Sequence, residues 1–187
     1  SRSKAYQRVE EGQFAQYAAH PEWCNAMGVA KTHELWLHLH GGKAGTRQLN
    51  RIADAIEDPP LCYAGAEWYR DTDVLGRIHP PDSRRFPWIE KRQSDMVEWL
   101  RRHQSEWSHW YGFYDYGGTQ QIWNEEMQSW NAWCGREGWF NSELDVHHAL
   151  FIQYYRTGDP VVFRMASALA RHNMDVDLCH FSTRSEG

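Results

Sequence analysis

The sequence predicts a mainly α-helical chain, and three observations carry that prediction. Residues 142–172 read as two helices that are joined by a tight turn. Residues 46–57 and 94–103 also place apolar side chains at helical spacing. A strand-like alternation is clear over residues 29–40. We therefore expect helical hairpins that pack side by side, preceded by one isolated strand.

The strand is predicted from its period of two. Leu35, Leu37 and Leu39 alternate with polar and aromatic residues, and a Gly-Gly pair follows at residues 41–42. No other segment offers an obvious partner, and a lone strand leaves its backbone donors and acceptors unpaired. We expect the partner strands to lie outside these residues, in a larger protein of which this chain is a fragment.

The segments between the strand and the hairpin are predicted from caps and breakers. A helix over residues 46–57 is expected to begin with Thr46 as its cap and to stop at two prolines. Residues 61–92, with three further prolines, are expected to form a long ordered loop. Helix is expected again over residues 94–103, a loop over 111–118 and a helix over 121–134.

The hairpin has the most complete local signals. Ser142 is expected to cap its first helix, with Asp145 three residues later as in a capping box. Gly158 can take the left-handed conformation that ends this helix. Asp159 then caps the second helix, and Pro160 occupies its first position, where a missing N–H has no consequence. One face of the first helix is expected to consist of Leu144, His148, Phe151 and Tyr155.

Composition limits the classes of partner. The net charge of −5 provides no basic surface, which argues against nucleic acid. No apolar run is long enough to span a bilayer, so no membrane partner is expected. Four widely spaced cysteines argue against a zinc ribbon and a small disulfide scaffold. Eleven Trp and nine Tyr exceed the needs of a core of this size, and their flat faces suit sugar rings. The compartment stays open between extracytoplasmic and cytoplasmic.

Three segments resemble a known family. WFNSELDVHHALFIQYYRTGD and the following FRMASALARHNMDVDLCH are similar to the α/α toroid domain of exo-acting rhamnogalacturonan lyases and their bacterial relatives. KTHELWLHLH resembles the closing strand of the β-sandwich that precedes that toroid, and WYGFYDYGG resembles a third family segment. Gly118 stands where the family commonly carries Asp. The resemblance implies a β-sandwich remnant over residues 1–45 and the N-terminal part of an α/α toroid over 46–187.

The resemblance also implies a reaction. Its substrate would be an oligo- or polysaccharide with rhamnose and uronate units, cleaved by β-elimination without a cofactor, although a divalent cation such as calcium is possible. This chemistry needs a base, an acid for the leaving oxygen, and a group that neutralises the uronate carboxylate. The catalytic candidates are His147, His148 and His180. Candidates for substrate binding are Asn141, Glu143, Tyr114, Tyr116, Trp123, Trp139, His172, Asp177, Arg171 and Arg156.

Ordinary structural roles compete with each of these assignments. Acidic residues at a helix start and basic residues at its end are expected from the helix dipole alone, and aromatic residues are often core. Three other functions also stay open. A glycoside hydrolase would take two carboxylates from Glu143, Asp145, Asp175 and Asp177. A non-catalytic relative would only bind carbohydrate, and a zinc hydrolase would use His38 and His40.

Overall fold

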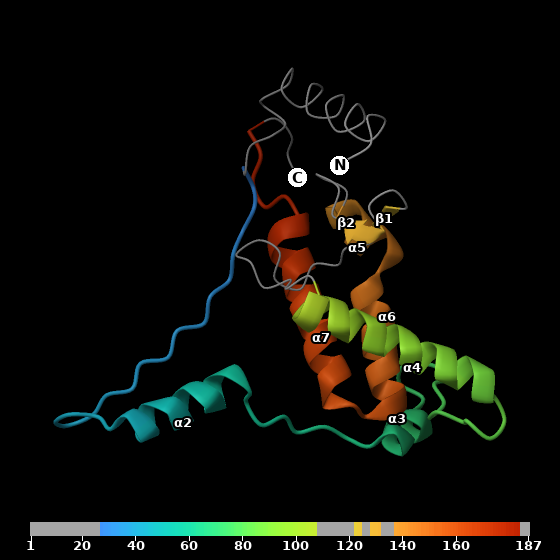
Figure 1. Cartoon of the computed structure of the whole chain (residues 1–187), viewed down its shortest axis with the longest axis horizontal. Helices are drawn as coiled ribbons and strands as arrows, with labels where there is room; N and C mark the ends of the chain where they lie inside the picture. The colour runs from blue at the N-terminus through green and yellow to red at the C-terminus, as the bar shows by residue number, and fades with distance from the viewer. Residues whose placement is uncertain (1–26, 108–121, 125–127, 132–136, 184–187) are drawn as a thin grey trace.

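The fold is mainly helical, as predicted for an α/α toroid domain. The computed structural model describes residues 27–107, 122–124, 128–131 and 137–183 (Figure 1). The described elements, with η marking a π-helical turn, are α2 (Thr46–Glu57), α3 (Ala66–Thr72), α4 (Pro87–Arg102), η2 (His103–Trp107), β1 (Ile122–Asn124), β2 (Ser129–Asn131), α5 (Glu137–Leu144), α6 (Val146–Thr157), α7 (Pro160–His172) and η3 (Asn173–Asp177). No helix in this part of the chain is both long enough and apolar enough to cross a membrane.

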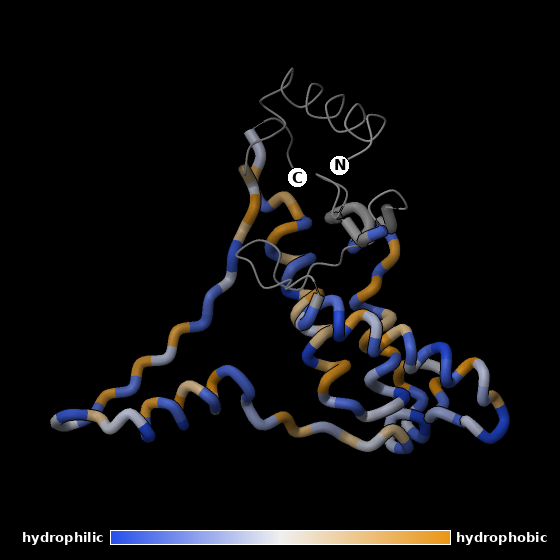
Figure 2. The backbone as a smooth tube through the Cα atoms, in the orientation of Figure 1, coloured by the Kyte–Doolittle hydropathy of each residue, from blue (hydrophilic) through white to orange (hydrophobic). Residues whose placement is uncertain are grey.

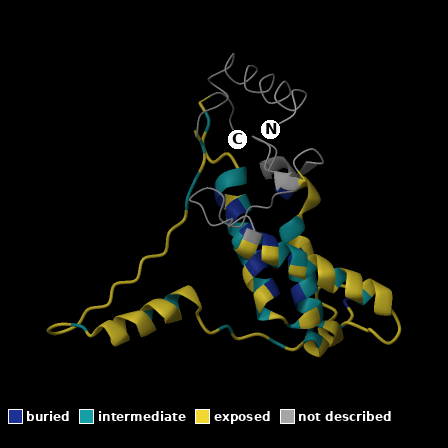
Figure 3. Ribbon diagram, in the orientation of Figure 1, coloured by how far each residue is buried: buried dark blue, intermediate teal, exposed yellow. Residues whose placement is uncertain are grey.

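The core lies between α6 and α7, which run antiparallel and side by side (Figure 1). Burial concentrates on this helix pair, whereas α2 and most of α4 stay exposed (Figure 3). Apolar burial is the dominant favourable term in folding, so this hairpin supplies most of the stability of the described part. The buried cluster consists of Leu150, Tyr154, Val162, Met165, Ala166 and Leu169.

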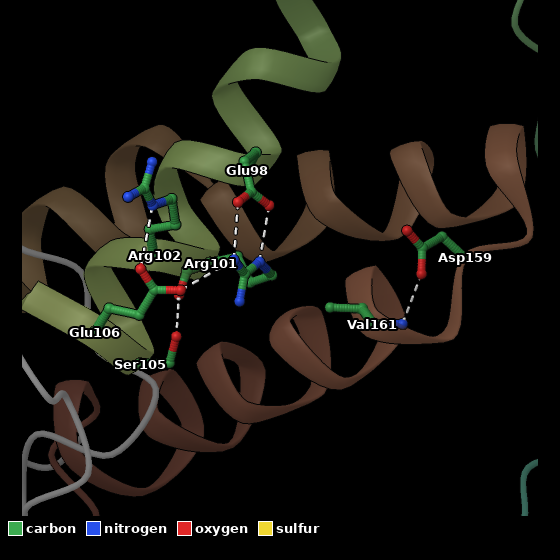
Figure 4. A network of polar contacts seen from close by, with 7 residues as sticks. All are labelled: Glu98, Arg101, Arg102, Ser105, Glu106, Asp159 and Val161. Atoms are coloured by element: carbon green, nitrogen blue, oxygen red, sulfur yellow. Dashed lines mark hydrogen bonds and ion pairs between the residues drawn. The ribbon is translucent and has the colours of Figure 1, made fainter.

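The turn between α6 and α7 follows the predicted signals. Gly158 has φ 70° and donates its N–H to the Tyr154 carbonyl at 2.7 Å. The Asp159 side chain accepts from the Val161 N–H at 2.8 Å, and Pro160 stands first in α7 (Figure 4). The end of the first helix and the start of the second are therefore confirmed.

The start of the first helix is corrected by the structure. Ser142 is not a cap but lies within α5, and the break comes at Asp145, which takes the left-handed conformation with φ 49°. This break changes the phase of the helix that follows. Leu150 and Tyr154 are the buried residues of α6, whereas Leu144 and His148 of the predicted shared face are exposed.

Residues 61–92 are not one long loop. α3 forms within them, and α4 begins at Pro87, seven residues earlier than predicted. Pro87 stands at the first helical position, where proline is favoured, so it starts this helix and does not interrupt one. Val97 and Leu100 of α4 pack against the α6–α7 core. Near the end of α4, Glu98 accepts two hydrogen bonds from Arg101 at 2.8 Å (Figure 4).

The helix predicted over residues 121–134 is also wrong where the structure describes it. β1 and β2 form a short antiparallel pair, with Trp123 opposite Trp130. The loop predicted over 111–118 lies outside the described residues. Local helical spacing was therefore overridden by cross-strand pairing.

An arm projects from the helical bundle (Figure 1). It consists of the extended residues 29–45 and the helix α2, whose bounds match the prediction, although Gly45 and not Thr46 is its N-cap. Residues 29–40 form no β-ladder within the described part, so the predicted strand is present as an extended segment only. Apolar and polar residues alternate along it (Figure 2). Leu35, Leu37 and Leu39 are 88%, 90% and 91% exposed.

Candidate functional site

A buried polar network joins α5 to the end of α7. The Asn141 side chain, which is fully buried, donates from Nδ2 to Asp177 Oδ2 at 2.9 Å. Asp177 Oδ1 lies 3.3 Å from Nε2 of His172, and both of these side chains are about 95% buried. The Asp177 carboxylate thus engages an amide on one side and an imidazole on the other. Three residues that the sequence singled out separately are brought together.

The network fixes how His172 presents its ring. Asp177 faces Nε2, so a neutral ring places its proton there and leaves the lone pair on Nδ1. Nδ1 is buried and has no hydrogen-bond partner among the described residues. A buried acceptor without a donor is uncommon in folded proteins.

A second carboxylate, Asp175, ties the arm to the same end of α7. Its Oδ2 accepts from the Thr32 N–H at 2.7 Å, and its Oδ1 accepts from the Thr32 hydroxyl at 2.9 Å. Burial alone would raise the Asp175 pKa, but both Thr32 bonds and the charges of Arg171 and Lys31 oppose it. The pKa therefore lies below its ordinary value.

Further bonds hold the segment after α7 in place. Asn173 Nδ2 donates to the Ser142 hydroxyl at 2.9 Å, a second link between α5 and η3. Nε2 of His180 lies 2.6 Å from the Met174 carbonyl, and the His180 backbone N–H donates to the Gly28 carbonyl at 2.8 Å. His180 is exposed, so its ring is anchored to η3 through one nitrogen while the other side faces outward.

The two neighbouring histidines of α6 differ in environment. Nε2 of His147 lies 3.1 Å from Asp145 Oδ1, and its buried Nδ1 has no hydrogen-bond partner within the described part. His148 is exposed. Adjacent residues of a helix point in different directions, so the pair offers one half-buried and one accessible imidazole.

The other predicted binding residues are spread more widely. Glu143 is exposed on α5, and Arg171 is 43% exposed, with its Nη2 3.9 Å from Glu34 Oε1. Tyr114 and Tyr116 lie outside the described residues. Trp123 lies in β1 and Trp139 in α5, and only their backbones are described.

Arg156 is engaged in contacts away from the buried network. Its guanidinium pairs with Glu90 Oε1 at 2.6 Å and also bonds Gln93, the Gln153 side chain at 2.9 Å and the His79 carbonyl at 3.1 Å. This arginine fastens α4 and the residues before it to α6. It is therefore a structural cation, and we correct its assignment as a possible uronate ligand.

Metal binding finds little support. The rings of His38 and His40 stack with centroids 5.8 Å apart, and His40 Nδ1 is bonded to the Gly42 carbonyl. Within the described ranges, no three His, Cys, Asp or Glu side chains are grouped as metal ligands. The His38 and His40 pair therefore has no third metal ligand among the described residues.

Sequence reasoning missed two residues of interest. Thr32 binds Asp175 across 143 positions of sequence, and no local signal points to such a contact. His103 is 4% exposed and begins the π-helical turn after α4, where desolvation lowers its pKa. For His103 the sequence does contain a signal. Residues 100–104 and 169–173 share the pattern Leu-x-Arg-His followed by an amide, and in both cases the buried His lies where an α-helix passes into a π-turn. Such turns are frequent at functional sites.

Comparison with known proteins identifies a family model and a relative that match this chain. Residues 59–185 match the family model described as "PcRGLX-like protein C-terminal alpha/alpha toroid domain". The chain is also similar to "Uncharacterized protein YetA" of Bacillus subtilis (strain 168), with 29% identity over 154 residues. That alignment covers 82% of this chain but only 18% of the relative, so the chain spans a minor part of the length of the protein it matches.

Proposed function

The chain belongs to the PcRGLX-like family through its C-terminal alpha/alpha toroid domain. On that premise we propose that it is part of a polysaccharide lyase. The lyase cleaves a rhamnose- and uronate-containing glycan by β-elimination. The observation that carries the proposal is the buried Asn141–Asp177–His172 network at the end of the helical hairpin. A simple packed hairpin gains little from three buried polar side chains, because each must be desolvated.

Accessible groups on α6, on α7 and in the segment after η3 match the demands of elimination. The proton beside the uronate carboxylate is weakly acidic, so a cation must stabilise the charge that develops when it is removed. Arg171 is partly exposed and its only ion pair among the described residues spans 3.9 Å, which leaves it available to a carboxylate. His148 and His180 are exposed imidazoles, and His147 is half-buried. We assign proton transfer to this set, since imidazole titrates near neutral pH.

The buried network contributes by holding other residues of the site in position. Asp177 joins α5 to η3, and η3 in turn anchors the His180 ring through the Met174 carbonyl. Glu143, which is exposed on α5, is the acceptor assigned to a sugar hydroxyl. Tyr114, Tyr116 and Trp139 remain proposals for stacking against sugar rings.

A glycoside hydrolase has less support. It needs two carboxylates that flank the scissile bond. Asp175 is engaged by Thr32, and Asp177 is engaged by Asn141 and His172. The two carboxylates left, Glu143 and Asp145, are exposed at the junction of α5 and α6. The elimination reaction is therefore the function that the geometry supports best.

The test follows the product. Elimination creates a conjugated double bond that absorbs in the near ultraviolet, whereas hydrolysis yields only new reducing ends. The intact protein is incubated with rhamnogalacturonan, and both signals are followed for wild type, H147A, H148A and H180A. We expect absorbance in wild type and a loss of about a hundredfold or more when the base is removed. H79A is the matched control, because His79 is exposed and its carbonyl contacts Arg156, which lies at the other end of α6 from His147 and His148. Reducing ends without absorbance would refute the lyase assignment.

A further inference from the structure

A groove lies in the arm, away from the network described above. It has a volume of about 1010 Å³ and runs between the extended segment and α2. One wall comes from alternate residues of the segment, Glu34, Trp36 and His38, with Leu37 also contributing. The opposite wall comes from α2, and Nε2 of Gln48 on that helix lies 3.5 Å from Nε2 of His38. The two walls thus face each other across a defined space.

The two arginines of the groove have no charged partner among the described residues. Arg47 and Arg51 both line it, one turn apart on α2, and neither forms an ion pair or a side-chain hydrogen bond with a residue that the structure describes. Trp36 faces the same space and is 69% exposed. Glu34 is the acidic residue among the lining groups, and its Oε1 is directed to Arg171 at 3.9 Å.

The two sides of the extended segment differ in chemistry. Leu35 and Leu39 do not line the groove, whereas Leu37 between them does. The groove side offers two guanidinium groups, an amide, an imidazole and an indole, set beside an apolar strip from Ile52, Ala55, Ile56, Pro59 and Pro60. Planar guanidinium groups pair with carboxylates, and indole faces stack on sugar rings.

We propose that this groove binds an acidic sugar chain, with Trp36 against a ring face and Arg47 and Arg51 paired with uronate carboxylates. The groove also leads toward the candidate site, since Glu34 contacts Arg171, the residue before His172. The inference rests on the proposed function for its substrate class and adds a binding region that lies outside the chemistry. A chain held here extends toward the end of α7.

The experiment measures binding alone. The probe is a de-esterified oligogalacturonate, titrated calorimetrically into the intact protein, and the matched ligand is the same oligomer fully methyl-esterified. The esterified oligomer keeps its rings but loses its charge. We expect R47Q/R51Q to weaken binding of the acidic probe by about tenfold, because two charge-assisted contacts are lost. W36A should weaken both oligomers. R77Q/R92Q is the control, since it removes two exposed arginines outside the groove, and it should change the affinity by less than about twofold.

Hydrogen exchange on the wild-type protein provides a second measurement that needs no variant. The acidic probe should protect residues 34–57 and leave α4 unchanged. Equal affinity for the two oligomers, or equal losses in R47Q/R51Q and R77Q/R92Q, would overturn the proposal. Neither measurement depends on turnover, so failure here leaves the elimination assay to be judged on its own.

Discussion

Removing Arg156 should destabilise the helical bundle strongly, because this residue completes a buried ion pair. Its side chain is 15% exposed and that of its partner Glu90 is 10% exposed. Arg156→Ala leaves the Glu90 carboxylate in a poorly solvated position without its cation. Breaking a buried pair by removing one partner costs about 3–5 kcal/mol. We expect a loss near the lower end of this range, because Glu90 is not fully buried. Two neighbouring amides, on Gln93 and Gln153, also lose their guanidinium donor.

Urea denaturation followed by circular dichroism measures this loss as a shift in the midpoint. Arg164→Ala is the matched control, because Arg164 pairs with Asp58 at 2.8 Å while both side chains are largely exposed. Such a surface pair contributes about 0–1 kcal/mol. A double-mutant cycle with Glu90→Gln should return a coupling energy above about 1 kcal/mol. Equal losses in Arg156→Ala and Arg164→Ala would show that the ion pair does not hold α4 to α6.

Two smaller predictions concern local structure and pH. Asp159→Ala should cost about 1 kcal/mol of stability, because the Val161 N–H loses its cap, and Gly158→Ala should cost about 1 kcal/mol, because an L-residue is strained at φ 70°. Both are checked by urea midpoints, and a cost near zero for either would contradict the role given to that residue. The Asp175 pKa is lower in the folded state, so its contribution is complete above the ordinary carboxyl pKa and is lost as the pH falls through the lowered value. The unfolding free energy of Asp175→Asn should therefore decrease less than that of wild type as the pH falls, and Thr32→Val should show a smaller effect of the same kind. An unchanged pH dependence in Asp175→Asn would exclude this contribution.

The elements that the sequence predicted well are those specified by neighbouring residues. Gly158, Asp159 and Pro160 each act within a few positions, so the turn between α6 and α7 was readable before any coordinates. Pro87 was misread, because proline both breaks a helix and begins one, and only the structure shows which. Asp145 takes a left-handed conformation that few non-glycine residues adopt, so the phase of α6 could not be predicted.

The candidate site depends on contacts that local patterns do not encode. Asn141 and Asp177 are 36 positions apart, and each was a reasonable helix-end residue on its own. Their burial around one imidazole follows only from the packing of η3 on α5. The sequence therefore named Asn141, His172 and Asp177 as candidates but could not show that they form a single network.

The most direct test compares two links between the same elements. Asp177→Asn keeps the shape of the side chain but removes the charge that orients His172, whereas Asn173→Ala removes the exposed bond to Ser142 between α5 and η3. The measurement is kcat for the conjugated elimination product of the intact protein, with circular dichroism as the check of folding. We predict a fall of about tenfold or more for Asp177→Asn and less than about twofold for Asn173→Ala. Equal kcat values in the two folded variants would contradict the proposal that the buried network supports catalysis.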